Sequence, residues 1–327
     1  MSVELIILCG FLGSGKTTLL VDYLKTDEAG DSGVIVNEVG EIGVDGVIVA
    51  DGSESLPMTL LANGCVCCSL RSDLVYTINT LLDAPRPEGR GPLRRIILET
   101  SGVSRPGPIL ASLADPDLIA RNLRVTVVST FDATRGAALI ESFEEAAAQL
   151  TAARRIVLTK LDQVAPDAHA AVRASAQAFN PLATVVADAD RMRAVQAAFA
   201  SDDDTARSGL DVALQALHSG VGTVRHPRLK VFMAYPEQPL DWTAFAEWLD
   251  DLAGLCGDRM LRMKAVVRVT DCADPIVIQS VGTTFSAPQR LARQPDARAV
   301  VIVIVRDIDD AELADGGPSG LLRLQAS

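Results

Sequence analysis

The sequence predicts an α/β fold, with a first domain built on a mostly parallel sheet with flanking helices and a smaller α+β domain after it. Short apolar runs rich in β-branched residues alternate with helix-like segments through roughly the first 190 residues. This alternation is typical of parallel strands covered by helices. The first run leads through a glycine-rich loop into the first helix, and the composition changes near residue 205.

The apolar runs predict the strands of the first domain at Val3–Leu8, Val34–Val36, Arg95–Leu98, Val125–Val128, Ile156–Leu158 and Thr184–Val186. Helices are expected between them, including Lys16–Lys25, Arg71–Leu82 and the alanine-rich segment Phe143–Ala153. Because strands and helices alternate along the chain, the sheet is expected to be parallel.

Three consecutive aspartates and a Gly/His/Pro segment follow the last of these elements and indicate a boundary. We expect a first domain at 1–205, a linker at 206–228 and a second domain at 229–327. Strands are predicted there at Leu229–Tyr235, Met263–Val269, Ile276–Val281 and Ala299–Arg306, with a helix beginning near Asp241. The helix carries Trp242, Phe245, Leu249 and Leu252 at helical spacing, so these side chains are expected to form one packing face.

Charge and hydropathy disfavour two classes of partner. The 327 residues include 30 Lys and Arg against 42 Asp and Glu, a net charge of −12, whereas nucleic-acid binders usually carry a basic footprint. The longest apolar stretches, such as Ala299–Val305, are far shorter than the roughly 18 residues of a membrane span. No Lys or Arg precedes the first apolar run, as a signal peptide would require. We therefore expect a cytoplasmic protein that binds neither nucleic acid nor membrane.

The segment Gly10–Thr17 reads GFLGSGKT and matches the phosphate-loop pattern G-x-x-x-x-G-K-[ST] between a strand and a helix. Backbone N–H groups of such a loop surround phosphate oxygens, and the helix N-terminus adds its dipole. Lys16 is expected to bridge the β- and γ-phosphates, and Thr17 to coordinate Mg²⁺. The alternative is an ordinary glycine turn. The expected nucleotide contacts are Gly13, Ser14, Gly15, Lys16, Thr17 and Thr18.

Two later segments supply further candidate contacts. Glu99 ends the strand RRIILE, where its carboxylate can reach the magnesium sphere, and Gly102 follows where its N–H can face the γ-phosphate. A strand end with a plain turn is the alternative. The tetrapeptide Thr159-Lys160-Leu161-Asp162 fits a [NT]-K-x-D loop, in which Asp162 accepts from guanine N1–H and the exocyclic amine. This pattern favours GTP over ATP, although Lys-x-Asp at a strand end is common.

Three of the six cysteines, Cys65, Cys67 and Cys68, crowd a turn just before a helix. Neighbouring thiolates repel one another unless a metal or a positive charge stabilises them. The cluster suits Zn²⁺, with Co²⁺ or Fe²⁺ as alternatives. Structural zinc sites usually have four protein ligands, so three thiols indicate an open or transferable site. A redox-active cluster and inert packing cysteines are the alternatives.

An acidic, glycine-punctuated segment, VNEVGEIGVDG, lies between the phosphate loop and the cysteines. Its carboxylates are Glu38, Glu41 and Asp45. A loop of this composition can rearrange with the γ-phosphate and Mg²⁺, and it would then link the nucleotide to the cysteines. The alternative is a solvated acidic loop.

Taken together, these motifs resemble the CobW family of P-loop GTPases, a group of metallochaperones and metalloenzyme activators. The matching segments are GFLGSGKTTLL, NEVGEIGVD, NGCVCCSLR, ETSGVSRPGPI, TKLD, Asn180-Pro181, LRMKAVVRV, IQSVGTTF and VVIVIVRDID. The resemblance implies a P-loop GTPase domain, slow GTP hydrolysis with Lys16, Glu99 and Glu41 in catalytic positions, and Asn180 in the ribose-side loop. It also implies a transition metal on the cysteines, with Glu41 as an additional ligand, and a C-terminal domain that contacts a client metalloprotein.

Two features depart from the family pattern. Val36 stands where some relatives have a glutamate ligand, and only three widely separated histidines occur, which disfavours metal storage. We expect a GTP-hydrolysing metallochaperone that delivers zinc to a client. Two alternatives stay open: a GTPase that remodels an apo-enzyme such as a nitrile hydratase, and a redox-sensing regulatory GTPase. The oligomeric state is also open, with a homodimer as one form.

Overall fold

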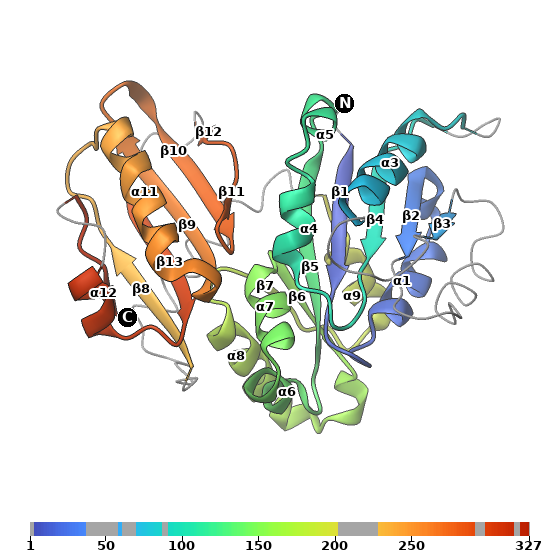
Figure 1. The fold of residues 1–327 in the computed structure, drawn as a ribbon. Coiled ribbons are helices and arrows are strands. Elements are labelled where there is room, and N and C mark those ends of the chain that lie inside the picture. Colours follow the sequence, from blue (N-terminus) through green and yellow to red (C-terminus); the bar gives the residue numbers. More distant parts are fainter. Residues whose placement is uncertain are drawn as a thin grey trace. The chain divides into compact units, whose positions relative to one another are not determined.

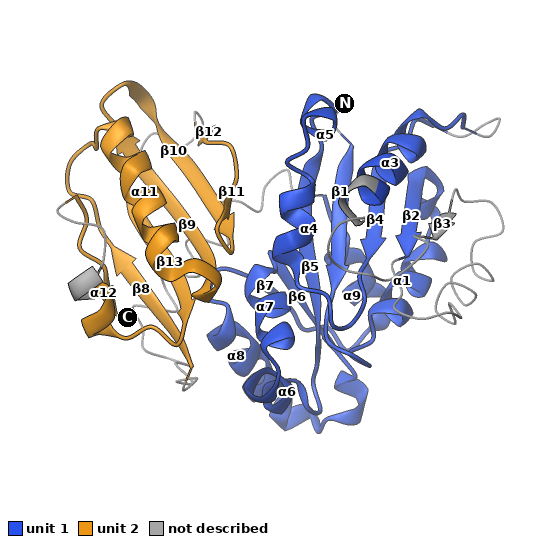
Figure 2. Ribbon diagram, viewed as in Figure 1, with its two compact units in different colours: residues 1–215 blue, residues 216–327 orange. Residues whose placement is uncertain are grey.

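The computed structural model describes residues 3–36, 58–60, 70–86, 91–201, 228–291, 298–316 and 321–326. The chain folds as two compact units, Met1–Gln215 and Ala216–Ser327 (Figure 2). The linker expected at 206–228 lies outside the described residues except for Arg228. The boundaries 1–205 and 229–327 therefore stay predictions.

The first unit contains a parallel sheet in the order β3-β2-β4-β1-β5-β6-β7, with helices on both faces (Figure 1). Its strands are β1 (Glu4–Cys9), β2 (Ser32–Val36), β3 (Met58–Leu60), β4 (Arg95–Glu99), β5 (Arg124–Asp132), β6 (Arg155–Thr159) and β7 (Thr184–Val186). Its helices are α1 (Lys16–Leu24), α3 (Leu70–Asp83), α4 (Pro106–Ser112), α5 (Pro116–Ala120), α6 (Gly136–Ser142), α7 (Glu144–Ala152), α8 (His169–Phe179) and α9 (Arg191–Ala198).

The predicted parallel sheet is confirmed, and each of the predicted strands is present. β1 is the central strand and all of its residues are buried, as expected for a strand covered on both faces. β3 was not predicted, because three residues are too few to show a periodic pattern. The strand predicted at Val125–Val128 extends to Asp132, which places this acidic residue at the end of β5.

The carboxyl ends of neighbouring strands lie in register at one edge of the sheet. Leu8 pairs with Glu99, Glu99 with Val36, and Val36 with Leu60. In parallel α/β sheets, ligands bind beside this edge, because the loops that leave it meet there. The phosphate loop, the loop after Glu99 and the segment after Leu60 all start from this edge.

The second unit is an antiparallel sheet with the order β11-β10-β9-β13-β8-β14, in which β12 also pairs with β10. Its strands are β8 (Leu229–Ala234), β9 (Met260–Val269), β10 (Cys272–Val281), β11 (Thr284–Phe285), β12 (Gln289–Arg290), β13 (Val300–Arg306) and β14 (Gln325–Ala326). Its helices are α11 (Trp242–Cys256) and α12 (Asp310–Gly316).

Helix α11 packs its apolar face on one side of this second sheet. Asp241 caps the helix by accepting a hydrogen bond from the Ala244 N–H at 2.9 Å. Phe245, Leu249 and Leu252 are buried in the core cluster, and Trp242 packs at its margin. The predicted packing face of this helix is therefore confirmed.

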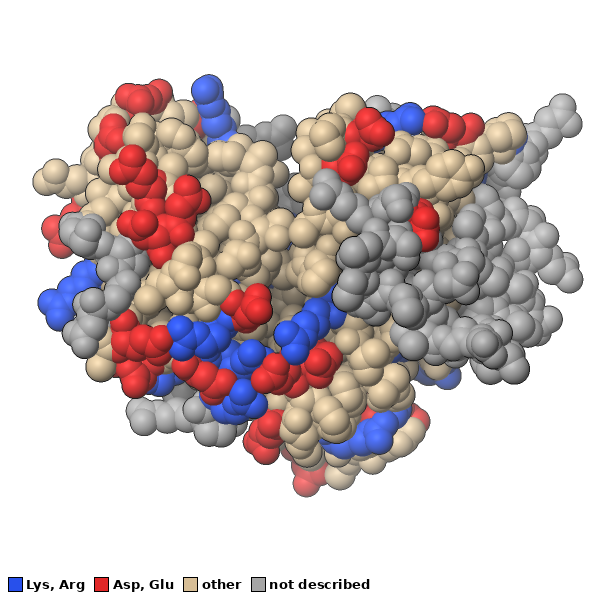
Figure 3. Space-filling model, viewed as in Figure 1, with Lys and Arg blue, Asp and Glu red and all other residues tan. Residues whose placement is uncertain are grey.

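The outer side of α11 is acidic, as the space-filling view shows (Figure 3). Glu247, Asp250 and Asp251 are exposed there. Within the described ranges, no helix is long and apolar enough to cross a membrane.

Candidate nucleotide site

The phosphate loop joins the end of β1 to the first turn of α1 and is held from below by β5. Gly10 has a φ of +144°, and a Cβ at this position would lie 2.1 Å from Thr130 Oγ1. Only glycine allows this close approach. The buried Ser14 hydroxyl shares a 2.7 Å hydrogen bond with Thr130 Oγ1. The side chain of Ser14 therefore anchors the loop. The nucleotide contact predicted for Ser14 would then be made by its backbone.

Lys16 and Thr17 begin α1 and face the end of β4. The Thr17 hydroxyl donates to Glu99 Oε1 at 2.6 Å, and Glu99 is only 3% exposed. Lys16 is also buried, and its Nζ donates to the Phe11 carbonyl at 3.5 Å. A hydroxyl and a carboxylate are hard oxygen donors of the kind that Mg²⁺ prefers. The structure thus brings together the two residues expected to serve magnesium, and their chemistry fits that ion.

The loop after β4 packs directly on the phosphate loop. A Cβ on Gly102 would lie 2.8 Å from the Leu12 backbone nitrogen, so a larger residue cannot occupy this position without displacing the loop. Gln149, on α7, donates through its amide to the Gly102 carbonyl at 3.0 Å and to the Ser104 carbonyl at 2.8 Å. Gln149 therefore fixes the position of Gly102, the residue expected to contact the γ-phosphate. The sequence motifs did not predict this role of Gln149.

The loop after β6 is also tied to the phosphate loop. The Thr159 hydroxyl donates to the Ser14 carbonyl at 2.7 Å. The Lys160 ammonium donates to the Gly13 carbonyl at 2.8 Å and pairs with Asp132 Oδ2 at 2.6 Å. Thr159 and Lys160 thus hold the TKLD loop beside the phosphate loop. Asp162 follows them in the same loop and takes no part in these contacts.

Asp132, at the end of β5, is buried and carries a strongly shifted pKa. Burial alone would raise the pKa of this carboxyl, but hydrogen bonds from Lys160, Thr134 and Arg135 outweigh burial and lower it to about 2. Asp132 is therefore ionised at neutral pH and fixes the position of the Lys160 ammonium.

A cavity of about 390 Å³ lies between α1, the TKLD loop and the start of α9, which is large enough to hold a purine base. Its lining includes Gly15, Thr18, Lys160 and Asp162, so it continues from the phosphate loop to the predicted guanine-reading carboxylate. The cavity also exposes Asp22, Gln163, Asp188 and Arg191, which the motifs did not predict.

Asn180, expected in the ribose-side loop, does not line this cavity. Its side chain is completely buried, and its amide donates to the carbonyls of Leu150, Thr151 and Ala153 at the end of α7. Its Oδ1 accepts from the Leu182 N–H at 3.0 Å. The hydrogen-bonding groups of this side chain are used at the end of α7, so it does not extend towards the cavity, and its expected nucleotide contact stays a prediction.

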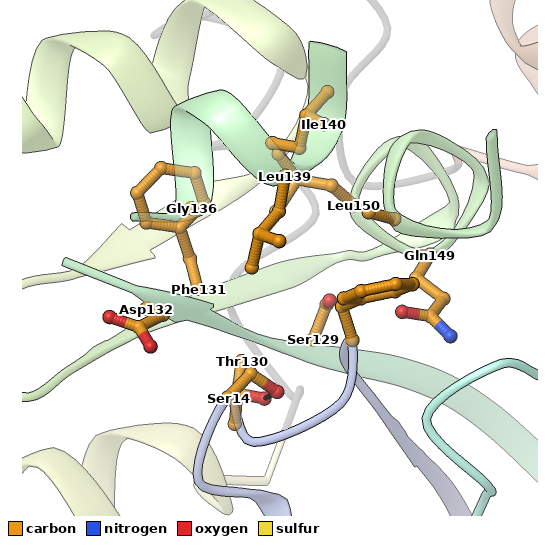
Figure 4. A pocket seen from close by; sticks show the side chains of 12 residues that line it. Ser14, Ser129, Thr130, Phe131, Asp132, Gly136, Leu139, Ile140, Gln149 and Leu150 are labelled. Carbon is orange, nitrogen blue, oxygen red and sulfur yellow. Dashed lines mark hydrogen bonds between the residues drawn. The ribbon is translucent and has the colours of Figure 1, made fainter. Parts of the chain in front are cut away.

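A second, smaller cavity lies behind the phosphate loop (Figure 4). Its volume is about 20 Å³, which is room for about one water molecule and not for a substrate. Ser14, Thr130 and Gln149 are among its lining residues. This space belongs to the support of the phosphate loop.

The predicted metal ligands Cys65, Cys67, Cys68 and Glu41 lie outside the described residues, as do Glu38 and Asp45. Their flanks are described. Val36 ends β2 with its side chain 2% exposed in the apolar core, so it offers no ligand atom. The cysteine segment starts after Leu60, at the carboxyl edge of the sheet, and ends before Leu70, where α3 begins.

Sequence reasoning missed Asp132, Gln149, Asp22 and Arg191. Asp132 had one available signal, since a polar residue at the carboxyl end of a parallel strand lies at the ligand-binding edge. Gln149, Asp22 and Arg191 lie within helices, where nothing in the sequence separates them from exposed polar residues.

The strand order, the phosphate loop and the adjoining base-sized cavity define a P-loop nucleotide-binding domain. Residues 4–187 match the model of the CobW/HypB/UreG nucleotide-binding domain, and residues 229–316 match that of the cobalamin synthesis protein cobW C-terminal domain. The chain therefore belongs to the CobW/HypB/UreG family.

Several characterised proteins are similar to the chain. Zinc chaperone YjiA of Escherichia coli is 34% identical over 161 residues, which are 49% of this chain and 50% of YjiA. Zinc chaperone CobW of Sinorhizobium is 33% identical over 197 residues, 51% of this chain and 53% of the relative. The chain thus spans about half the length of these curated relatives.

The fold of the chain is also that of a solved structure. The crystal structure of Zn(II)-bound YjiA GTPase from Escherichia coli has a TM-score of 0.63 at 18% identity and covers 97% of this chain and 99% of its own. Both units of the chain therefore have counterparts in one known protein fold.

Proposed function

We propose that the chain is a GTP-binding and GTP-hydrolysing metallochaperone that binds a transition metal, zinc first, at Cys65, Cys67 and Cys68. One observation carries the nucleotide part of the proposal. The pair Thr17–Glu99 and the cavity that ends at Asp162 lie on two sides of the same phosphate loop. A nucleotide seated on this loop meets a magnesium-type donor set at its phosphates and a carboxylate at its base.

Each of the residues around the phosphate loop then has a defined task at the phosphates. The Lys16 ammonium would neutralise the β- and γ-phosphates, and the Thr17 hydroxyl would be a ligand of Mg²⁺. Glu99 would hold the water shell of that ion, and Gly102 would offer its N–H to the γ-phosphate. Bound Mg²⁺ offsets the charge that develops on the phosphate oxygens during hydrolysis.

At the other side of the loop, Asp162 accepts from the two donors on the Watson–Crick edge of guanine. Adenine presents the opposite pattern there, and a carboxylate cannot pair with it. Lys160, held by Asp132 and the Gly13 carbonyl, keeps this loop at a fixed distance from the phosphates.

The metal part of the proposal rests on the sequence motif and on the sheet edge. Three closely spaced thiolates suit Zn²⁺, and the buried Val36 provides no further ligand, which leaves Glu41 to complete the set. The segment that carries the cysteines leaves β3 in the same row of residues as Glu99. A change at the γ-phosphate is therefore linked to the cysteine segment through three hydrogen-bonded strand ends.

The names of the relatives support zinc as the cargo and a metalloprotein as the client. Two of them are named zinc chaperones, and a Schizosaccharomyces pombe relative, 28% identical over 190 residues (56% of this chain and 45% of the relative), is named zinc-regulated GTPase metalloprotein activator 1. We propose a client metalloprotein as the partner and the cytoplasm as the location.

The test is a titration of the reduced protein with Zn²⁺ and Co²⁺ against a chelating dye, in Mg²⁺-GTP and again in Mg²⁺-GDP. Coupling between sites is reciprocal and typically amounts to about a 5- to 150-fold change in affinity. We expect a shift of this size for the preferred ion. Tight binding without a shift would make the cysteines a structural site, and absence of binding would favour the redox alternative.

Two matched variants separate the parts of the site. Cys67→Ala should abolish tight metal binding and leave GTP binding intact. Cys272→Ala removes a cysteine of β10 in the second unit and should change neither. Equal loss of metal and GTP binding in Cys67→Ala would contradict the proposed division of tasks.

A further inference from the structure

An ion pair between Arg191 and Asp22 borders the base cavity. Arg191 is the first residue of α9, and Asp22 lies on α1, in the same helix as Lys16 and Thr17. The Arg191 Nη2 group donates to Asp22 Oδ2. Both residues line the cavity, and the Arg191 side chain is 67% exposed while that of Asp22 is 13% exposed. The guanidinium is thus braced at one end and accessible from the cavity.

The Thr159 hydroxyl and the Lys160 ammonium of the TKLD loop already have partners within the protein. The Thr159 hydroxyl has one proton, and it is directed to the Ser14 and Phe131 carbonyls at 2.7 and 3.2 Å. The Lys160 ammonium is held by Gly13 and Asp132. These two side chains hold the loop in place. Among the other side chains that line the cavity, the Gln163 amide and the Arg191 guanidinium can donate to the O6 and N7 acceptors of a bound guanine.

The remaining acidic residues of the cavity cannot supply a donor. Ionised carboxylates only accept hydrogen bonds, which suits Asp162 for the N1–H and amine of guanine. Asp188 already accepts from the Asp190 N–H at 2.9 Å. An arginine, in contrast, presents paired N–H groups that match the O6 and N7 atoms of guanine in a bidentate contact.

We propose that Arg191, positioned by Asp22, donates to the O6/N7 edge of the guanine base and is a second specificity-determining residue opposite Asp162. This inference rests on the proposed binding of guanine nucleotides. It assigns the two faces of base recognition to different elements, Asp162 to the loop after β6 and Arg191 to α9. Because Asp22 belongs to α1, base recognition is tied to the helix that begins at Lys16.

The experiment compares dissociation constants for GDP, 7-deaza-GDP and IDP on the full chain, measured by displacement of a fluorescent GDP. 7-Deaza-GDP lacks the N7 acceptor, and IDP lacks the amine that Asp162 reads. The wild type should bind GDP about tenfold more tightly than 7-deaza-GDP, within the range of discrimination that one arginine contact gives. In Arg191→Ala this ratio should fall to about one, while the preference for GDP over IDP persists.

Three further variants complete the experiment. Asp22→Asn keeps the guanidinium and weakens its brace, so the GDP to 7-deaza-GDP ratio should fall partway. Arg193→Ala removes the next arginine of α9, which does not line the cavity, and should leave both ratios unchanged. Gln163→Ala removes a side-chain amide that also lines the cavity and should leave the 7-deaza ratio unchanged.

The inference is overturned if Arg191→Ala keeps the full ratio of GDP to 7-deaza-GDP affinity, because a backbone N–H would then pair with N7. It is also overturned if Gln163→Ala loses this ratio. Failure of the wild type to bind GDP at all overturns the proposed function as well, so the two failures are distinguishable. Circular dichroism of each variant checks that the fold is retained.

Discussion

Gln149 and Gly102 are 47 positions apart in the sequence and are joined by a hydrogen bond of 3.0 Å from the glutamine amide to the glycine carbonyl. The same amide donates to Ser104 at 2.8 Å, so one side chain of α7 holds both sides of the turn after β4. The opposite face of Gly102 lies against Leu12 of the phosphate loop. This turn is therefore fixed from two sides where the γ-phosphate is expected.

The contact predicts that Gln149→Met weakens binding of GTP more than binding of GDP. Methionine has a similar volume but no donor, so the two carbonyls lose their partner and the turn is less well ordered. We expect a loss of about 3- to 30-fold in affinity for a non-hydrolysable GTP analogue, on the order of one to two hydrogen bonds. Isothermal titration calorimetry with both nucleotides measures it.

Gln177→Met is the matched control for this substitution. Gln177 also donates its amide to three carbonyls, those of Asn180, Pro181 and Ala183, but it does so at the end of α8. It should lower stability without changing the ratio of GTP to GDP affinity. If the ratio of GTP to GDP affinity is also unchanged in Gln149→Met, the turn keeps its position without the two hydrogen bonds of Gln149.

A second prediction concerns the hydrogen bond from Thr17 to Glu99. Glu99→Gln keeps an oxygen that can accept from Thr17 but removes the negative charge that orients the magnesium water shell. Loss of such an outer-shell partner costs about 10- to 100-fold in metal affinity or activity. We expect GTP hydrolysis to require correspondingly more Mg²⁺, which a phosphate-release assay over a magnesium series would show. Glu141→Gln, on the exposed side of α6, is the control, and equal magnesium curves for the two variants would contradict the assignment.

The sequence predicted the motif residues of this site better than the residues that hold them in place. Lys16, Thr17, Glu99 and Asp162 follow from motif spacing, because each motif sits at a strand end and parallel strands bring those ends together. Asn180 also had a motif resemblance, yet the helix end of α7 uses its amide. The contacts of Gln149 and Arg191 depend on how helices pack across the sheet, and no local pattern encodes that packing.

A third prediction tests the guanine-reading role of Asp162. In Asp162→Asn the side chain offers a donor as well as an acceptor, so it pairs poorly with guanine and better with xanthine, whose C2 carries an oxygen. The affinity for GDP should fall by about 10- to 100-fold, while that for XDP should rise above it, in line with the loss of a charge-assisted contact. Competition binding with both nucleotides provides the measurement. Retained preference for GDP would contradict base reading by this carboxylate.

A fourth prediction follows from the low pKa of Asp132. Its folded-state pKa of about 2 lies below the ordinary value of 3.8, so the ionised carboxylate stabilises the folded protein above about pH 4. This stabilisation is lost as the pH falls from about 4 towards 2. A shift of this size corresponds to roughly 2 kcal/mol. Asp132→Asn should therefore lower the free energy of unfolding of the nucleotide-binding unit by about this amount at pH 7.

Urea denaturation at pH 7, 5 and 3 measures the difference between Asp132→Asn and the wild type. The difference should be the same at pH 7 and 5 and about half as large at pH 3, because the unfolded wild type then binds a proton. Asp190→Asn is the control, since this carboxylate is exposed and caps α9. A difference that is independent of pH would mean that packing, and not the charge of Asp132, accounts for the loss.

The last prediction uses the buried cysteines to isolate the chemistry of the Cys65, Cys67 and Cys68 cluster. Burial raises the pKa of the Cys9 thiol to about 12 and that of Cys256 to about 11, and neither side chain is accessible. Thiolates are the reactive form, so both residues should stay unmodified by a thiol-specific reagent at pH 8. Cys272 is partly accessible. A variant in which the three clustered cysteines are alanine should therefore show at most one rapidly reacting thiol in the native state and three in denaturant.

Stoichiometric Zn²⁺ added to the wild type should then protect every rapidly reacting thiol except that of Cys272. Modification that zinc leaves unchanged would contradict metal binding at the cluster.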